Sequence, residues 1–198
     1  MPSAAEVKPA RERILDAAAS VMRERGVANT TTKAIAAAAG YSEAMLYKHF
    51  ADKQELFLLV LKERLPALRV ALAAAGTGDL AANLGAIVEQ LMNYFAELFP
   101  MSVSIFSAPD LLVQHREGIA RHGGLGPTGP IRMLTTYLDD ERARGRIRSD
   151  ADTTAAAQLL VGGAFHQGFL AAFEGKSTVT DAPALAAAAV AVALPALT

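Results

Sequence analysis

The side chains best suited to chemistry gather in residues 31–50, where hydroxyl, ammonium and imidazole groups alternate with small apolar residues. The spacing predicts two short helices, at residues 32–39 and 42–49, separated by a turn that contains Gly40. Glycine can take the positive φ angle that a sharp exit from a helix requires. In a helix-turn-helix of this kind the second helix lies in the major groove of DNA, while the first crosses the backbone. The segment therefore predicts binding to double-stranded DNA.

The polar side chains of this segment divide by the part of DNA that they can reach. A helix N-terminus favours phosphate through its free N–H groups, and the residues there are Thr31, Thr32 and Lys33. The start of the second helix reaches base edges, and its residues are Ser42, Glu43, Ala44 and Met45. Further side chains can donate to phosphate oxygens; they are Tyr47, Lys48, His49 and Lys53.

Glu43 has two interpretations that the sequence leaves open. A carboxylate on a DNA-binding surface repels phosphate, so its presence among these residues needs a reason. It can accept a hydrogen bond from the amino group of a cytosine. It can equally serve only as a partner of the helix dipole.

The elements that position these residues are predicted to be helices throughout. Apolar residues recur at three- and four-residue spacings, and no segment shows the alternation of a strand. Helices are expected at residues 9–25, 52–65, 80–99, 102–115, 131–144, 150–173 and 184–194. Pro66 should kink the chain before helicity resumes to Ala75, Pro100 should stop a helix, and Pro109 should interrupt one. A flexible loop is expected at residues 118–130, which hold five glycines and two prolines.

The inner faces of the two short helices can also be predicted. Their apolar residues lie where each helix would meet the other, and they are Ile35, Ala36, Ala39, Leu46 and Phe50. Small alanines would let the two helices approach closely.

Residues 13–61 resemble the DNA-binding domain of the tetracycline-repressor (TetR) family. The residues that carry the resemblance are Ile14-Leu15-Asp16-Ala17-Ala18, Arg25-Gly26, Thr30-Thr31, Ile35-Ala36, Ala39-Gly40, Leu46-Tyr47, His49-Phe50, Lys53 and Leu56. The resemblance implies phosphate contacts by Tyr47, His49 and Lys53, base reading by residues 42–45, and repression. The chain departs from the family pattern at Ala34, where an acidic residue often stands, at Tyr41, usually small, and at Glu43, often basic.

The sequence predicts an all-α protein of two domains. Residues 9–55 are expected to form a three-helix DNA-binding domain, and residues 56–198 a helical domain that binds a ligand and dimerises. Gly162, Gly163 and Gly168 interrupt a long helix, where each glycine costs about 1 kcal/mol relative to alanine. This cost favours a close approach, either within the chain or to a partner. We interpret the helix that carries these glycines, together with the alanine-rich last helix, as a two-fold homodimer interface. The dimer would place two DNA-binding domains on a palindromic operator.

Aromatic residues of the second domain could line an apolar cavity for a small effector. The predicted lining residues are Phe95, Phe99, Phe106, Met133, Tyr137, Phe165, His166 and Phe169. The alternative for each of them is a place in the ordinary core. Because few polar groups accompany them, the effector is expected to be largely apolar.

Several classes of function are disfavoured. The chain has no cysteine, which excludes disulfides and Cys-ligated zinc. His115 and His122 lack metal-ligand spacing, and no phosphate loop or nucleophile elbow occurs. We therefore expect no metal, no cofactor and no enzymatic activity.

The N-terminal residues contain no apolar run of the kind found in a signal peptide. The apolar tail at residues 182–197 is mostly alanine and contains two prolines, so no membrane span is expected there. We therefore expect a cytoplasmic protein. The sequence thus predicts a ligand-responsive transcriptional regulator, and the family resemblance implies that it represses. The alternative is a constitutive DNA-binding dimer without a small-molecule ligand.

Overall fold

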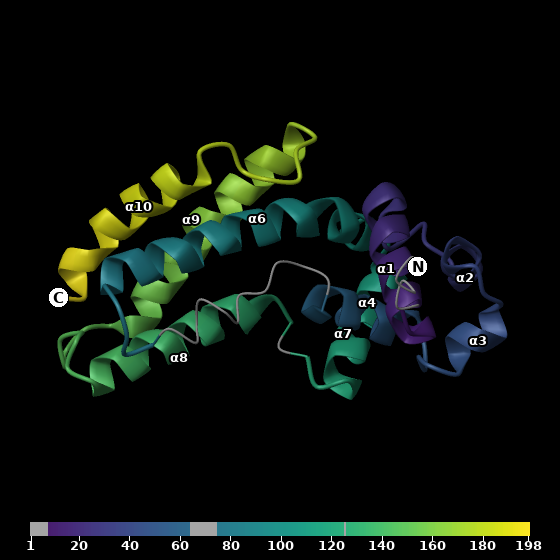
Figure 1. Ribbon diagram of the computed structural model, residues 1–198, viewed down its shortest axis with the longest axis horizontal. Coiled ribbons are helices and arrows are strands. Elements are labelled where there is room, and N and C mark those ends of the chain that lie inside the picture. The colour runs from purple at the N-terminus through teal and green to yellow at the C-terminus, as the bar shows by residue number, and fades with distance from the viewer. Residues whose placement is uncertain (1–7, 64–74, 125) are drawn as a thin grey trace, which may run out of the picture. The chain divides into compact units, whose positions relative to one another are not determined.

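The structure, a computed structural model, describes residues 8–63, 75–124 and 126–198. Every regular element in these ranges is a helix (Figure 1), which confirms the predicted all-α fold. The chain divides into two compact units. Unit 1 takes the described residues up to 63 together with Pro100–Gly123, and unit 2 takes residues 75–99 and those from 124 onward. The kink expected at Pro66 lies outside the described residues.

Unit 1 is built around α1 (Ala10–Arg25), which packs against α2 (Thr32–Ala39) and α4 (Lys53–Glu63). The short α3 (Glu43–Tyr47) packs on α2, and α7 (Pro109–Arg121) packs on α4. The predicted inner faces of the two short helices are confirmed, because all of their residues are buried: Ile35, Ala36, Ala39, Leu46 and Phe50.

Local hydrogen bonds set the ends of α2 and α3. The Thr31 hydroxyl accepts from the amide of Ala34 at 3.1 Å, and the Ser42 hydroxyl accepts from the amide of Met45 at 3.3 Å. These contacts satisfy amides that a helix leaves free at its N-terminus. Gly40 ends α2 in the left-handed conformation, with φ of 75°. Residues of the turn itself therefore end α2 and begin α3.

The turn between α1 and α2 is bonded to the last part of α6 (Leu80–Phe106) within unit 1. The amide of Val27 donates to the Met101 carbonyl at 2.8 Å, and the amide of Ala28 donates to Ser104 Oγ at 3.1 Å. Gly26 has a φ of 73°, and a Cβ on it would lie 2.7 Å from Ser104 Oγ. Glycine is therefore required here for both its conformation and its size.

Two prolines fall in places that the sequence did not predict correctly. Pro100 lies inside α6, whereas the helix was expected to stop before it. A proline inside a helix removes one backbone hydrogen bond, and the two units divide between Phe99 and Pro100. Pro109 stands in the first turn of α7, where a missing N–H costs nothing, and so it starts a helix instead of interrupting one.

The glycine-rich stretch at residues 118–130 is not a continuous loop. Helix α7 continues to Arg121, a 3₁₀ turn follows at Gly126–Thr128, and α8 begins at Gly129. Gly118 allows α7 to lie close to α4, because a Cβ on it would be 2.9 Å from the Cβ of Gln54. The missing side chain thus serves helix packing.

Unit 2 contains the first part of α6, α8 (Gly129–Ala143), α9 (Thr153–Phe173), α10 (Ala182–Ala193) and a final 3₁₀ turn (Leu194–Ala196). Helix α9 packs against both α8 and α10 (Figure 1). Among the described residues, α9 is long and apolar enough to cross a membrane, by length and composition alone. One side of it lies in the core of unit 2.

One fully buried carboxylate, that of Glu141 on α8, binds the chain before α6 and the chain after α8. Glu141 Oε1 accepts from the amide of Gly76 at 2.9 Å, and its Oε2 lies 3.2 Å from Nε of Arg146. A buried charge is tolerated when it is both hydrogen-bonded and paired with an opposite charge. Burial and the neighbouring Glu141 raise the pKa of Tyr137 to about 12, so its hydroxyl is neutral at ordinary pH.

Gly168 should be intolerant of any side chain. A Cβ there would lie 2.5 Å from the Phe95 Cβ and 2.9 Å from backbone atoms of Ala96 and Met92. Gly168→Ala should therefore lower the free energy of unfolding by about 1–3 kcal/mol in urea denaturation. Gly85→Ala is the matched control, because no described atom lies within 4 Å of a Cβ at that position. It should raise stability by up to about 1 kcal/mol; equal effects at the two sites would contradict the close approach.

Candidate functional site

The residues predicted to face DNA lie on α2 and α3, in the turns beside them and at the start of α4. The exposed ones are Thr31, Lys33, Ser42, Glu43, Ala44, Tyr47, Lys48 and His49, while Thr32, Met45 and Lys53 are partly buried. Helix α3 ends two residues earlier than expected, since the amide of His49 donates to the Leu46 carbonyl at 3.0 Å. This tighter three-residue step places Lys48 and His49 in a turn after the helix.

Two hydroxyl groups connect α2 with α3 at this surface. The Thr32 hydroxyl donates to Glu43 Oε1 at 2.6 Å, and the Tyr47 hydroxyl donates to Thr32 Oγ1 at 3.3 Å. A phenol has a single O–H donor, so in this arrangement Tyr47 does not have a proton free for a phosphate. The Glu43 carboxylate is turned toward Thr32 and is held there.

Tyr41 departs from the usual small turn residue, and the structure supplies a reason for it. The Arg13 guanidinium lies over the Tyr41 ring, 4.8 Å from its centroid, and its Nη1 donates to the Tyr41 hydroxyl at 3.2 Å. Its Nη2 donates to the Ala39 carbonyl at 3.0 Å, at the end of α2. Arg13 therefore fixes the turn from α1, a role that sequence reasoning missed. A large aromatic residue at a turn position that is usually small was the available signal.

Lys53 stabilises the fold of unit 1 in addition to its predicted contact with DNA. Its Nζ donates to the carbonyl oxygens of Val27 and Thr30, both at 2.9 Å, and burial lowers the pKa of its ammonium group. An ammonium group has three N–H donors, so one remains for a phosphate. The two bonds tie the start of α4 to the turn between α1 and α2.

His115 and His122 are both engaged with α4. His115 Nδ1 lies 3.1 Å from Gln54 Oε1, and burial lowers the pKa of its imidazole. Asp52 lies 3.7 Å from Nε2 of His122 and 3.3 Å from Nη1 of Arg121. These contacts join the two helices within unit 1, and they give the histidines a packing role.

The structure brings together four of the residues predicted to line an effector cavity. Ring centroids lie 5.2 Å apart for Phe95 and Phe165, 4.8 Å for Phe99 and Phe165, and 5.5 Å for Phe99 and Phe169. Phe95 is buried, whereas Phe165 and Phe169 are about half exposed. The four rings form an aromatic cluster between α6 and α9 with part of its surface open.

The other four predicted lining residues lie apart from this cluster. Phe106 belongs to unit 1 and is 71% exposed. Met133 and Tyr137 line a shallow pocket of about 220 Å³ on α8, together with Thr136 and Asp140. His166 is exposed on α9.

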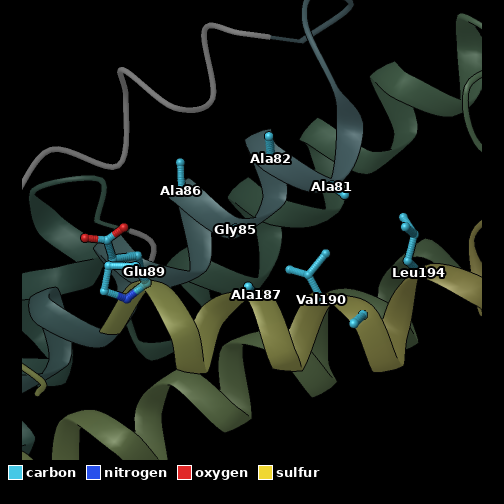
Figure 2. A pocket seen from close by; sticks show the side chains of 10 residues that line it. Ala81, Ala82, Gly85, Ala86, Glu89, Ala187, Val190 and Leu194 are labelled. Carbon is cyan, nitrogen blue, oxygen red and sulfur yellow. The ribbon is translucent and has the colours of Figure 1, made fainter. Parts of the chain in front are cut away.

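An open groove of about 490 Å³ runs between α6 and α10 in unit 2 (Figure 2). Figure 2 shows Ala82, Gly85 and Ala86 on α6, and Ala187 and Val190 on α10. Almost all of its lining side chains are small and apolar, and Glu89 supplies a carboxylate. None of the eight residues predicted from the sequence lines this groove.

Comparison with known proteins places these features in one family. Residues 14–60 match the model of bacterial regulatory proteins of the tetR family. The transcriptional repressor BepR from Brucella suis is 40% identical over 167 residues, which cover 79% of this chain and 78% of that protein.

Solved structures share the fold at lower sequence identity. A TetR-family transcriptional regulator from Mesorhizobium loti aligns with a TM-score of 0.70 and 21% identity, over 95% of this chain and 96% of the other. The regulator FadR from Bacillus subtilis, in complex with stearoyl-CoA, aligns with a TM-score of 0.66 and 17% identity, over 94% and 99%. With its helix-turn-helix and its repressor relative, the chain belongs to the TetR family of transcriptional regulators.

Proposed function

We propose that this chain is a ligand-responsive repressor that binds a palindromic operator as a homodimer in the cytoplasm. The exposed surface of α3, which Thr32 links to α2, is the observation that carries the proposal. Residues 42–45 would meet base edges in the major groove. Phosphate contacts would come from Lys33, Lys48, His49 and the remaining N–H of Lys53.

A dimer is proposed because α3 alone reads too few base pairs for a specific site. The outer sides of α9 and α10 support it, since Leu159, Phe173 and Val192 are 74%, 82% and 84% exposed. Exposed large apolar side chains are typical of an interaction surface when they form a patch. Gly162 and Gly163 lie on the same side of α9, and a Cβ on either would meet no described atom within 4 Å. Their cost to the helix is offset if a partner helix approaches them closely.

The aromatic cluster of Phe95, Phe99, Phe165 and Phe169 is the proposed contact surface for a largely apolar effector. Its partly open rings would bury further apolar area when a ligand covers them. The effector would favour a second arrangement of the dimer whose recognition helices no longer fit successive major grooves, about 34–36 Å apart. Helix α6 is suited to carry the change, because it contributes the cluster's Phe95 and Phe99 as well as the Met101 and Ser104 that hold the turn of unit 1.

The test is to select bound DNA from random sequence and then to titrate the selected site with and without compounds found by thermal shift. Long-chain acyl-CoA thioesters belong in that screen, since a structural neighbour holds one. A specific site whose affinity falls about 5- to 150-fold with a compound is expected. A specific site that no compound affects would favour the constitutive dimer instead. Failure to select any sequence would contradict both.

Lys53→Ala should have two separate effects. The carbonyl groups of Val27 and Thr30 would lose their donor, which should lower the free energy of unfolding by about 1–3 kcal/mol. Loss of one phosphate contact should also reduce the slope of log affinity against log salt by roughly one unit. Lys62→Ala, an exposed lysine of the same helix, should change stability by less than about 0.5 kcal/mol. A changed sequence preference with an unchanged salt slope would contradict the assigned role.

Gly163→Leu should weaken the dimer. The added side chain would overpack the proposed seam at a cost of about 1–3 kcal/mol, and sedimentation at micromolar concentration should show more monomer. Arg132→Leu adds a similar side chain to an exposed position of α8 and should leave the dimer intact. If both variants sediment like the parent protein, the interface lies elsewhere.

Phe169→Ala should reduce the effect of the identified ligand on DNA affinity while leaving DNA affinity without ligand nearly unchanged. The reason is that it removes one wall of the aromatic cluster without touching unit 1. Phe106→Ala removes an exposed ring of unit 1 and should keep the full ligand response. DNA titrations of the three proteins measure both quantities, and an unaltered response in Phe169→Ala would place the effector outside the cluster.

A further inference from the structure

We propose that Glu43 reads a cytosine in each half of the operator, and that a hydrogen-bond relay from Tyr47 through Thr32 aims its carboxylate. The inference rests on the proposed function, because it requires α3 to lie in a major groove. It assigns a base and an orienting mechanism to a residue that departs from the family pattern.

The geometry fixes one oxygen of the carboxylate. Thr32 donates to Glu43 Oε1 at 2.6 Å, a length typical of a hydroxyl bonded to a charged carboxylate. Tyr47 donates to Thr32 Oγ1 at 3.3 Å and so polarises that hydroxyl further. Glu43 stands in the first turn of α3 and is exposed, so its second oxygen is directed by the same bond and remains available to DNA.

The helix-dipole interpretation is less well supported by these contacts. The N-terminus of α3 already has its cap, because the Ser42 hydroxyl accepts from the amide of Met45 at 3.3 Å. The Glu43 carboxylate reaches instead to the side chain of Thr32 on another helix. A partner of the dipole alone would have no need for this link.

The chemistry of the major groove then selects the base. Guanine presents only acceptors, and thymine presents an acceptor and a methyl group. The amino group of adenine lies beside N7, an acceptor that repels a carboxylate. The amino group of cytosine lies beside C5–H on its own ring instead of beside an acceptor, so cytosine is the base that a carboxylate recognises best. Phosphate would repel Glu43 everywhere else on the DNA surface.

The relay also changes the role expected of Tyr47. While its only O–H proton is donated to Thr32, it orients Glu43 and does not donate to a phosphate. Removal of a residue that contacts only phosphate would weaken binding to all DNA sequences alike. Tyr47→Phe should therefore also reduce discrimination at the cytosine position.

The experiment compares the DNA sequences selected from random libraries by the full chain and by three variants. The parent should select cytosine at one position of each half-site, and replacing it should weaken binding by roughly 5- to 150-fold. Glu43→Gln should shift the preference toward adenine, because an amide pairs with adenine N6 and N7. Glu43→Ala should show no preference there, and Thr32→Val should keep cytosine with a smaller penalty. Since Glu43 is exposed, its variants should melt like the parent.

Glu24→Gln is the matched control, because it removes the same charge from an exposed position on α1 and should leave every base preference unchanged. If Glu43→Gln and Glu43→Ala select the same bases as the parent and alter only overall affinity or salt dependence, the inference is overturned while the proposed function stands. If the parent selects no sequence at all, the proposed function and this inference both fail.

Discussion

The turn at residues 26–30 is the point on which unit 1 depends, because other elements satisfy its backbone groups. Val27 and Thr30 are almost fully buried, and a buried amide or carbonyl left without a partner costs about 1–3 kcal/mol. The amide of Val27 is bonded to α6, and its carbonyl is bonded to Lys53 of α4. The exit of the chain from α1, and hence the placement of α2 and α3, follows from these bonds.

The same bonds give α6 a direct connection to the helix-turn-helix. A displacement of the segment after Pro100 would act on the turn through Met101 and Ser104. Pro100 itself lacks an amide hydrogen, so α6 has one hydrogen bond fewer at the boundary between the two units. In the proposed mechanism, α6 couples the aromatic cluster to the recognition helix α3. The missing hydrogen bond at Pro100 lets α6 bend, and its bonds to the turn at residues 26–30 transmit the movement.

Local pattern was sufficient to predict the helix-turn-helix. The spacing of Ile35, Leu46 and Phe50 determines which sides of α2 and α3 are buried, and no distant residue is needed to infer it. Contacts between residues far apart in the sequence could not be predicted from this local pattern. The size of Tyr41 indicates that something packs on the turn, but not that the partner is Arg13, which lies 28 residues earlier. Pro100 lies inside α6, although proline disfavours a helix interior.

The glycines of α9 and the candidate effector residues show the same limit of sequence reasoning. Gly162, Gly163 and Gly168 look alike in the sequence, yet only Gly168 is packed against a helix of its own chain among the described residues. Phe106 follows Phe99 on one helix, but the two belong to different units, and helical spacing alone could not separate them. Helical spacing predicts which side of a helix is buried, but it does not predict which other element packs against that side.

Hydroxyl-radical footprinting of the selected operator tests the dimeric repressor most directly. Two heads related by a two-fold axis predict two equivalent protected stretches, with centres about 34–36 Å apart or a multiple of that distance. Protection of both should disappear together as the ligand is added. A single protected stretch, or uniform protection along the DNA, would contradict a homodimer that reads a palindrome.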